Sequence, residues 1–397
     1  MNFVYISPHF PRTYWMFCNR LKKNGANVLG IGDAPYDTLD PRVRESLTEY
    51  YYVPSMEDYD QMLRAVAFFT FKYGKIDWIE SNNEYWLEQD ARLRTDFHVT
   101  TGEQYVDIGR VKHKSNMKPY YKKAGVAVAR LHKITTIQEA KKFLKQVGYP
   151  VIVKPDIGVG ANDTYRLDSE EDLARFFGNK PSVPYVMEEF VTGNIFSYDA
   201  ILDSESRPLF ESMTAWPPSI MDIVLKQTDL AYYVAADMPD DLRKAGRDTV
   251  KAFGVKSRFV HLEFFRLTAA KKGLGRVGGL VGLEVNMRPA GGYTPDMMNY
   301  AHSTDVYQIW ADMATADRRL LPDSGDHQFC AYAGRRDCHT YVHTHEEILS
   351  CYGGAIVMHE AMPPMMQPQM GNYSYTAKLK TEQETKAFIR FVQEQLA

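Results

Sequence analysis

Two carboxylates and an amide occur at strand-like spacing within residues 257–288, and their arrangement favours a divalent metal ion. The segments SRFVHLEFFRL and LVGLEVNMRP both read as strands, and KKGLG between them is rich in turn residues. A hairpin with its tip at residues 273–274 places Glu263 almost opposite Glu284, and directly paired residues have Cβ atoms about 4.5–5.5 Å apart. Carboxylates that close repel one another unless a cation neutralises them. Asn286 shares the face of Glu284, so the sequence predicts magnesium, or manganese as the alternative ion, held by Glu263, Glu284 and Asn286.

Arg288 continues the same face of the second strand. Its guanidinium offers donors in a fixed planar fork that matches phosphate or a developing oxyanion, so Arg288 is the predicted catalytic residue. The alternative interpretation is a solvated strand face with ordinary charges. His261 and Phe265 on that face, and the sequence Arg-Pro-Ala-Gly-Gly that ends the strand, favour the metal site.

Lys154 follows an apolar, β-branched run in YPVIVKPD and precedes a loop that contains Gly158 and Gly160. Lysine is rarely fully buried, and glycine lets the backbone approach a ligand and form a mobile cover. This pairing suits a triphosphate, although a lysine at a strand end can also reach water through its stem. The sequence contains neither a GxGxxG turn after its first strand nor a GxxxxGK[ST] loop, which argues against dinucleotide binding and a P-loop.

The elements that must position these residues predict an α/β fold. FVYIS reads as a strand, Tyr14, Phe17 and Leu21 mark a helix that Gly25 ends, and NVLGIG reads as a second strand. A strand–helix–strand start predicts a parallel sheet. We expect a Rossmann-like domain over 1–110, a small lobe with a glycine flap over 111–187, and a large lobe over 188–397 that carries the metal-binding hairpin and a C-terminal subdomain.

Composition is that of a globular enzyme, with 397 residues, 45% apolar and 24% charged. A net charge of −3 argues against a nucleic-acid partner. The absence of an apolar run of about 18 residues argues against a membrane partner. An N-terminus without signal-peptide features, together with only four cysteines, predicts the cytoplasm. Cysteines and histidines gather over 330–351, but their spacing fits no zinc pattern, whereas Thr344-x-x-Glu347 is a helix capping box.

Together these motifs resemble the ATP-grasp superfamily, specifically its carboxylate–amine ligase branch, which includes L-amino-acid ligases. The resemblance runs from about residue 111 to 315, and the N-terminal sheet is similar to the family's pre-ATP-grasp domain. It implies that ATP and Mg²⁺ are bound, with roles for the following residues: Lys114 and Lys154 as nucleotide lysines, 158–164 as the phosphate-covering flap, Glu188 as the contact to the base amino group, Glu189 to Val191 as backbone contacts to the base, Glu263, Glu284 and Asn286 as magnesium ligands, and Arg288 as the phosphate and acyl-phosphate stabiliser.

The resemblance implies an enzyme that transfers the γ-phosphoryl group of ATP to a carboxylate and joins the acyl phosphate to an amine. The substrates would be small molecules, amino acids among them, and a homodimer is one possible assembly. Two alternatives stay open: a biotin-carboxylase-like or purine-pathway enzyme that phosphorylates bicarbonate or formate, and a non-catalytic ATP-binding regulatory module. Two positions depart from the family pattern, with Ile195 where an acidic ribose ligand is frequent and Asn162 in place of the flap serine. Residues that could line an acceptor pocket, or simply pack, are Trp216, His261 and His302.

Overall fold

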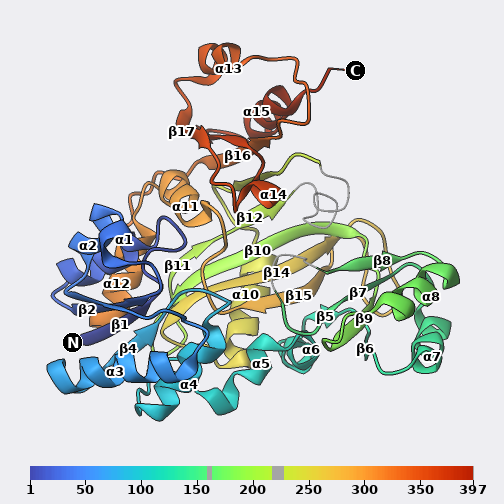
Figure 1. Ribbon diagram of the computed structural model, residues 1–397. Coiled ribbons are helices and arrows are strands. Elements are labelled where there is room, and N and C mark those ends of the chain that lie inside the picture. The colour runs from blue at the N-terminus through green and yellow to red at the C-terminus, as the bar shows by residue number, and fades with distance from the viewer. Residues whose placement is uncertain (159–162, 217–227, 397) are drawn as a thin grey trace.

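The computed structural model describes residues 1–158, 163–216 and 228–396. The strands within these residues form three sheets, one parallel, one large and mixed, and one small and antiparallel (Figure 1). Helices cover the parallel sheet on the left of Figure 1, and the small sheet forms a lobe on the right. The α/β fold class and the parallel N-terminal sheet are therefore confirmed.

The N-terminal sheet has the strand order β3-β2-β1-β4. Its elements are β1 (Asn2–Ile6), α1 (Trp15–Lys23), β2 (Asn27–Gly32), α2 (Pro41–Ser46), β3 (Glu49–Tyr52), α3 (Tyr59–Tyr73), β4 (Trp78–Glu80) and α4 (Leu87–Asp96). Both faces of β1 are buried, as a parallel sheet requires. A helix from far along the chain, α12 (Val306–Ala316), completes one face beside α1, where the Trp310 ring centroid lies 5.6 Å from that of Phe3 and 4.9 Å from that of Phe17 (Figure 1).

The small sheet has the order β6-β9-β7-β8. Its elements are β6 (Leu131–Lys133), α7 (Ile137–Val147), β7 (Val151–Pro155), β8 (Tyr165–Leu167), α8 (Glu170–Asn179) and β9 (Tyr185–Glu189). Both helices of this lobe are capped, because the hydroxyls of Thr136 and Ser169 accept from backbone N–H groups of the first turns. Since β9 runs to Glu189, residues 188–189 lie in this sheet, beyond the expected small lobe of 111–187.

The large sheet carries the hairpin. From the edge strand inward it contains β5 (Ala127–Val128), β15 (Leu280–Asn286), β14 (Arg258–Leu267), β10 (Gly193–Leu202), β12 (Thr214–Trp216) and β13 (Ala231–Val234). β11 (Pro208–Ser212) also pairs with β10, and α10 (Asp240–Phe253) packs on the sheet. Tyr198 of β10 lies against this helix at Gly246, where a Cβ atom would come within 2.2 Å of the ring. Residues 127–128, which fall within the expected small lobe, also belong to the large sheet, because β5 pairs with β15.

Two consecutive helices connect the N-terminal sheet to the rest of the chain, α5 (Gly109–Lys112) and α6 (Lys114–Lys123). The break falls at His113, whose backbone is extended. Lys114 is therefore the first residue of a helix, and Tyr121 in the same helix donates a hydrogen bond to the carbonyl of Glu284 at 2.8 Å. Through this contact α6 is fixed against β15.

The C-terminal elements extend the large sheet. They are α11 (Thr294–His302), β16 (Phe329–Arg335), α13 (His345–Tyr352), β17 (Ile356–Ala361), α14 (Gln367–Met370), β18 (Tyr373–Leu379) and α15 (Glu382–Gln393). Thr344 and Glu347 form the expected capping box at the start of α13. The zinc alternative has no support: Cys330 is buried while Cys338 and Cys351 are exposed, and among the described residues no three His, Cys, Asp or Glu side chains are grouped to hold a metal.

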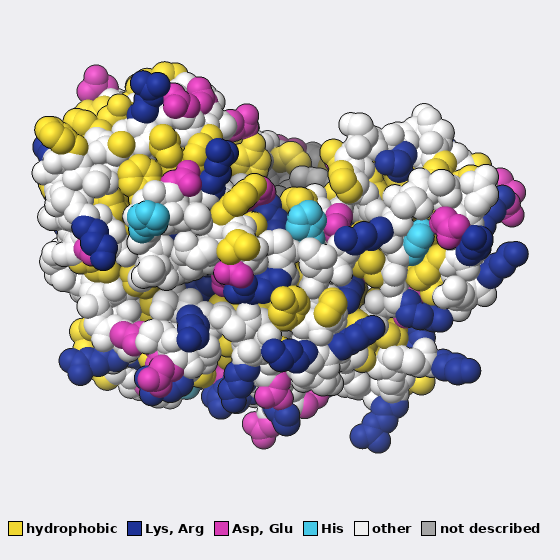
Figure 2. All heavy atoms as spheres, turned by 90° about the horizontal axis from the view of Figure 1, so that it is seen from below, with side chains coloured by type: hydrophobic (Ala, Val, Ile, Leu, Met, Phe, Trp, Pro, Cys, Tyr) yellow, Lys and Arg dark blue, Asp and Glu magenta, His cyan; other side chains and the backbone are white. Residues whose placement is uncertain are grey.

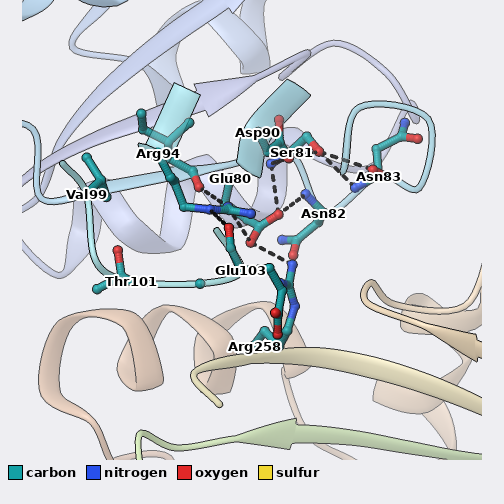
Figure 3. A network of polar contacts seen from close by, with 12 residues as sticks. Glu80, Ser81, Asn82, Asn83, Asp90, Arg94, Val99, Thr101, Glu103 and Arg258 are labelled. Atoms are coloured by element: carbon teal, nitrogen blue, oxygen red, sulfur yellow. Dashed lines mark hydrogen bonds and ion pairs between the residues drawn. The ribbon is translucent and has the colours of Figure 1, made fainter. Parts of the chain in front are cut away.

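A buried ionic network links the N-terminal sheet to the large sheet (Figure 3). Arg258 at the start of β14 donates to the Glu80 carboxylate at the end of β4 at 2.9 Å, and Arg94 of α4 lies 3.6 Å from the same carboxylate. Arg94 also donates to the carbonyls of Ile79 and Glu103 at 2.7 and 2.9 Å. Because unpaired buried charges are costly, these contacts hold the two sheets in one relative position.

No helix among the described residues is long and apolar enough to cross a membrane. On the face seen from below in Figure 2, basic and acidic side chains are interspersed, in keeping with the small net charge.

Candidate nucleotide and metal site

The two hairpin carboxylates face each other as predicted. Glu263 on β14 is the direct partner of Glu284 on β15, and a register shift follows immediately after Glu263. Each carboxylate has a cationic partner, with Lys114 Nζ 3.0 Å from Glu284 Oε1 and His261 Nε2 3.1 Å from Glu263 Oε1. Their side chains are 21% and 17% exposed, so both remain open to a ligand.

Asn286 extends this face, because it is paired with His261 across the hairpin. It is only 4% exposed, yet its side-chain amide makes no hydrogen bond to any residue that the structure describes. Arg288 follows two residues later, and its Nε lies 3.9 Å from Glu84 Oε2. Burial raises the pKa of Glu84 despite the nearby Arg288, and Glu84 brings the N-terminal unit to the edge of the site.

Three buried lysines surround the second part of the site. Lys154 and Lys118 lie 2.7 and 2.6 Å from the two carboxylate oxygens of Glu188. Burial opposes the charge on Glu188, but Lys118 and Lys154 outweigh it and lower the pKa of Glu188 to about 2. Burial also opposes the charge on Lys154, yet Glu188 and Glu284 raise its pKa, whereas burial dominates at Lys118 and lowers its pKa.

The predicted flap begins beside Lys114. Lys114 Nζ donates to the carbonyl of Gly158 at 2.8 Å, which ties the first residue of the predicted flap to the lysine that is predicted to bind the nucleotide. The Asp156 carboxylate accepts from the backbone N–H of Ser115 at 2.8 Å and from its hydroxyl at 2.9 Å, so it fixes the start of α6. Gly160 and Asn162 lie outside the described residues.

The segment predicted to contact the base, Glu188 to Val191, begins in β9 and ends in an apolar cluster. The Glu189 carboxylate points away from the lysines and binds Arg130, accepting from its backbone N–H at 2.7 Å and its guanidinium at 2.7 Å. Val191 is buried in a cluster completed by Ala129, Leu267, Leu274 and Val281. These side chains form an apolar cluster that begins two residues after Glu189.

The chain is similar to known proteins over a short family model and, in fold, over its whole length. A family model described as the carbamoyl-phosphate synthase L chain, ATP binding domain, matches residues 113–185. The solved L-amino acid ligase from Bacillus licheniformis has a TM-score of 0.70 at 14% identity, covering 100% of this chain and 98% of that one. The fold that this chain shares with that enzyme is the ATP-grasp fold.

Two further ATP-grasp proteins are similar to this chain, one in sequence and one in fold. The L-arginine-specific L-amino acid ligase of Bacillus subtilis is 24% identical over 274 residues, which are 65% of this chain and 62% of that relative, so the match spans less than two thirds of its length. A biotin carboxylase domain from Hydrogenobacter thermophilus, solved with MgADP and bicarbonate, has a TM-score of 0.67 at 15% identity and covers 98% of this chain and 88% of that one. The chain therefore resembles ATP-grasp carboxylate–amine ligases.

Three residues that the structure brings to the candidate site were not predicted from the sequence. Lys118 stands one helical turn after Lys114, a spacing that places both on one face of a helix and could have drawn attention to it. Asp199 and Glu84 carried no local signal, because they meet the hairpin only through the tertiary fold. Asp199 is fully buried on β10, opposite His261.

The candidate acceptor residues are split between two places. Trp216 packs edge-on against His261 with ring centroids 5.5 Å apart, so both lie near the hairpin. His302 lies elsewhere, lining a cavity of about 320 Å³ with Ser212, Arg243 and Arg319 that contains none of the predicted ATP-grasp site residues. His302 Nε2 is 2.9 Å from the Ser212 hydroxyl, and burial lowers the pKa of His302 to about 4.

Proposed function

We propose that this chain is an ATP-dependent carboxylate–amine ligase that forms an amide or peptide bond and releases ADP and phosphate. The proposal is carried by one observation: Glu263 and Glu284 meet directly across the hairpin, and the lysine that pairs with Glu284 also contacts the root of the flap. The fold of the ATP-grasp relatives and the names of the two L-amino acid ligases among them support it.

The residues of the site fit a magnesium nucleotide. Two partly exposed carboxylates and an amide with no hydrogen-bond partner among the described residues make an oxygen-rich set, and Mg²⁺ usually takes one or two carboxylates together with substrate phosphates. Glu263, Glu284 and Asn286 would hold the ion, which would neutralise charge on the phosphates. Lys114 and Lys154 offer charge-assisted donors to phosphate oxygens, while Val191 and its apolar neighbours suit the base.

The chain's own residues then account for the remaining demands of the reaction. Arg288 presents a fixed fork beside the carboxylates, suited to the charge that develops on a phosphorylated carboxylate. The flap anchored at Lys114 would exclude water, which otherwise hydrolyses an acyl phosphate. No protein nucleophile is required, because positioning and charge neutralisation are sufficient for phosphoryl transfer.

The test is ATP-dependent hydroxamate formation with hydroxylamine, run against single amino acids, other carboxylates, bicarbonate and formate. The proposal predicts a hydroxamate and equimolar phosphate with at least one organic carboxylate. Phosphate release that requires bicarbonate would instead favour a bicarbonate-phosphorylating enzyme, such as the biotin carboxylase that shares the fold. ATP binding with no turnover on any member of the panel would favour a regulatory module.

A pair of isosteric variants tests the metal assignment within the same assay. Glu284→Gln removes one charge from the proposed metal site, and we expect turnover to be lost while the protein still folds. Glu346→Gln alters an exposed glutamate on α13 and should retain full activity. Unchanged turnover in Glu284→Gln would contradict the metal site.

A further inference from the structure

His261 links two carboxylates through the interior of the large sheet. Asp199 on β10 is its direct partner on one side, and Asn286 on β15 is its partner on the other. His261 Nδ1 lies 2.6 Å from Asp199 Oδ1, and Nε2 lies 3.1 Å from Glu263 Oε1. A carboxylate only accepts hydrogen bonds, so the ring donates in both directions.

Asp199 is itself held in place. It is completely buried, and its second oxygen accepts from the hydroxyls of Ser197 and Thr214, the latter at 3.2 Å. Trp216 covers one edge of the imidazole. The ring therefore has a fixed position from which it points Nε2 at Glu263.

Glu263 depends on this contact. Among the described residues, His261 is the only hydrogen-bond partner of the Glu263 carboxylate. The positive charges of Arg288 and Lys154 are close enough to attract the same carboxylate. Without the imidazole, these cations would compete for Glu263.

We propose that His261 is a positioning residue, which Asp199 fixes and which holds the Glu263 carboxylate in the orientation that a divalent metal bound with nucleotide requires. This inference rests on the proposed function, because it gives His261 a task only if Glu263 is a metal ligand. It also assigns His261 to the metal site and not to an acceptor pocket. Side chains that orient a metal ligand typically change metal affinity about 10–100-fold when they are replaced.

The first experiment measures Mn²⁺ binding to the full-length protein in the presence of ADP, from the electron paramagnetic resonance signal of free Mn²⁺. In His261→Asn the amide nitrogen can replace Nδ1 toward Asp199, but nothing reaches Glu263. We expect the dissociation constant for Mn²⁺ to rise about 10–100-fold, while ADP alone binds as it does to the wild type. In His261→Gln the longer amide can replace Nε2, and we expect it to recover part of the affinity.

Two variants keep the test independent of folding defects. His302→Asn is the same substitution at another buried histidine, so it should lower the unfolding temperature without changing Mn²⁺ affinity. Asp199→Asn is isosteric and removes the charge that fixes the ring, and it should weaken Mn²⁺ binding even if His261→Asn does not fold.

The outcomes separate this inference from the proposed function. If Glu263→Gln weakens Mn²⁺ binding but His261→Asn and Asp199→Asn keep wild-type affinity, the positioning role of His261 is overturned and the metal site stands. If Glu263→Gln itself leaves Mn²⁺ affinity unchanged, the metal assignment fails, and the proposed function fails with it.

Discussion

The contact between Glu188 and its two lysines gives a prediction whose size can be worked out. Replacing Glu188 by Gln preserves the shape of the side chain but leaves Lys118 and Lys154, each 7% exposed, without their shared carboxylate. The pKa of Glu188 falls from 4.5 to about 2 in the folded protein. This difference corresponds to a contribution of roughly 3 kcal/mol to the free energy of unfolding at neutral pH. The general cost of removing one partner from a buried ion pair, about 3–5 kcal/mol, is similar.

The pH dependence follows from the sign of that shift. A carboxyl group whose pKa is lowered on folding contributes its full stability above the unfolded value of 4.5, and the contribution disappears as the pH falls toward 2. Glu188→Gln should therefore be about 3 kcal/mol less stable than the wild type at pH 7, with a deficit that shrinks steadily between pH 5 and pH 2.5.

Urea unfolding, monitored by hydrogen exchange of the β7 and β9 amides, measures this loss of stability in the strands that carry Lys154 and Glu188. Glu170→Gln is the control, because Glu170 pairs with Lys141 on an exposed surface of the same lobe and should cost less than about 1 kcal/mol. A deficit below about 1 kcal/mol for Glu188→Gln at pH 7, or one that is equally large at pH 2.5, would refute the ion-pair argument.

Three further predictions concern the contacts between the sheets and the hairpin. Arg258→Met leaves Glu80 without its closest cation and should cost about 3 kcal/mol, measured as a lower urea midpoint. Gly282→Ala would bring a Cβ atom within 2.4 Å of the Tyr121 ring, so it should cost about 1–3 kcal/mol in the same measurement and weaken Mn²⁺ binding in the presence of ADP. Burial and the neighbouring Glu80 raise the pKa of Asp90 to about 7, so the folded protein keeps a proton that the unfolded chain releases near pH 4. Wild-type stability should fall relative to Asp90→Asn as the pH rises from 5 to 8, and unfolding temperatures at both values check this.

The hairpin was predictable because its evidence is local. Strand alternation fixes which residues share a face, and the turn-rich KKGLG segment fixes the register, so the pairing of Glu263 with Glu284 required no knowledge of the rest of the fold. The helix cap at Thr344 was predictable for the same reason, since it depends on one residue and the turn that follows it.

What could not be predicted depends on contacts between distant segments. Asp199 is 62 residues from His261, and Glu84 is more than 200 residues from Arg288. The packing of α12 on the N-terminal sheet and the pairing of β5 with β15 likewise join segments with no sequence signal for each other. The direction of the Glu188 side chain also depends on contacts between distant segments. Alternation places it on one face of β9, but only the approach of α6 explains why Lys118 joins Lys154 of the neighbouring strand β7 there.

The charges of the site have a common arrangement that explains why a nucleotide and a metal would enter together. Glu284 is paired with Lys114, Glu263 with His261, and Glu188 with Lys118 and Lys154. A triphosphate that bound alone would separate a lysine from its carboxylate and leave that carboxylate without a cation. A metal ion that bound alone would be repelled by the cations that already pair with the carboxylates. A metal–nucleotide complex brings both charges, so the lysines can turn to phosphate while the carboxylates turn to the metal. The pair of Lys114 with Glu284 is therefore suited to exchange, whereas His261 keeps its contacts with Asp199 and Glu263 and so fixes the orientation of the Glu263 carboxylate.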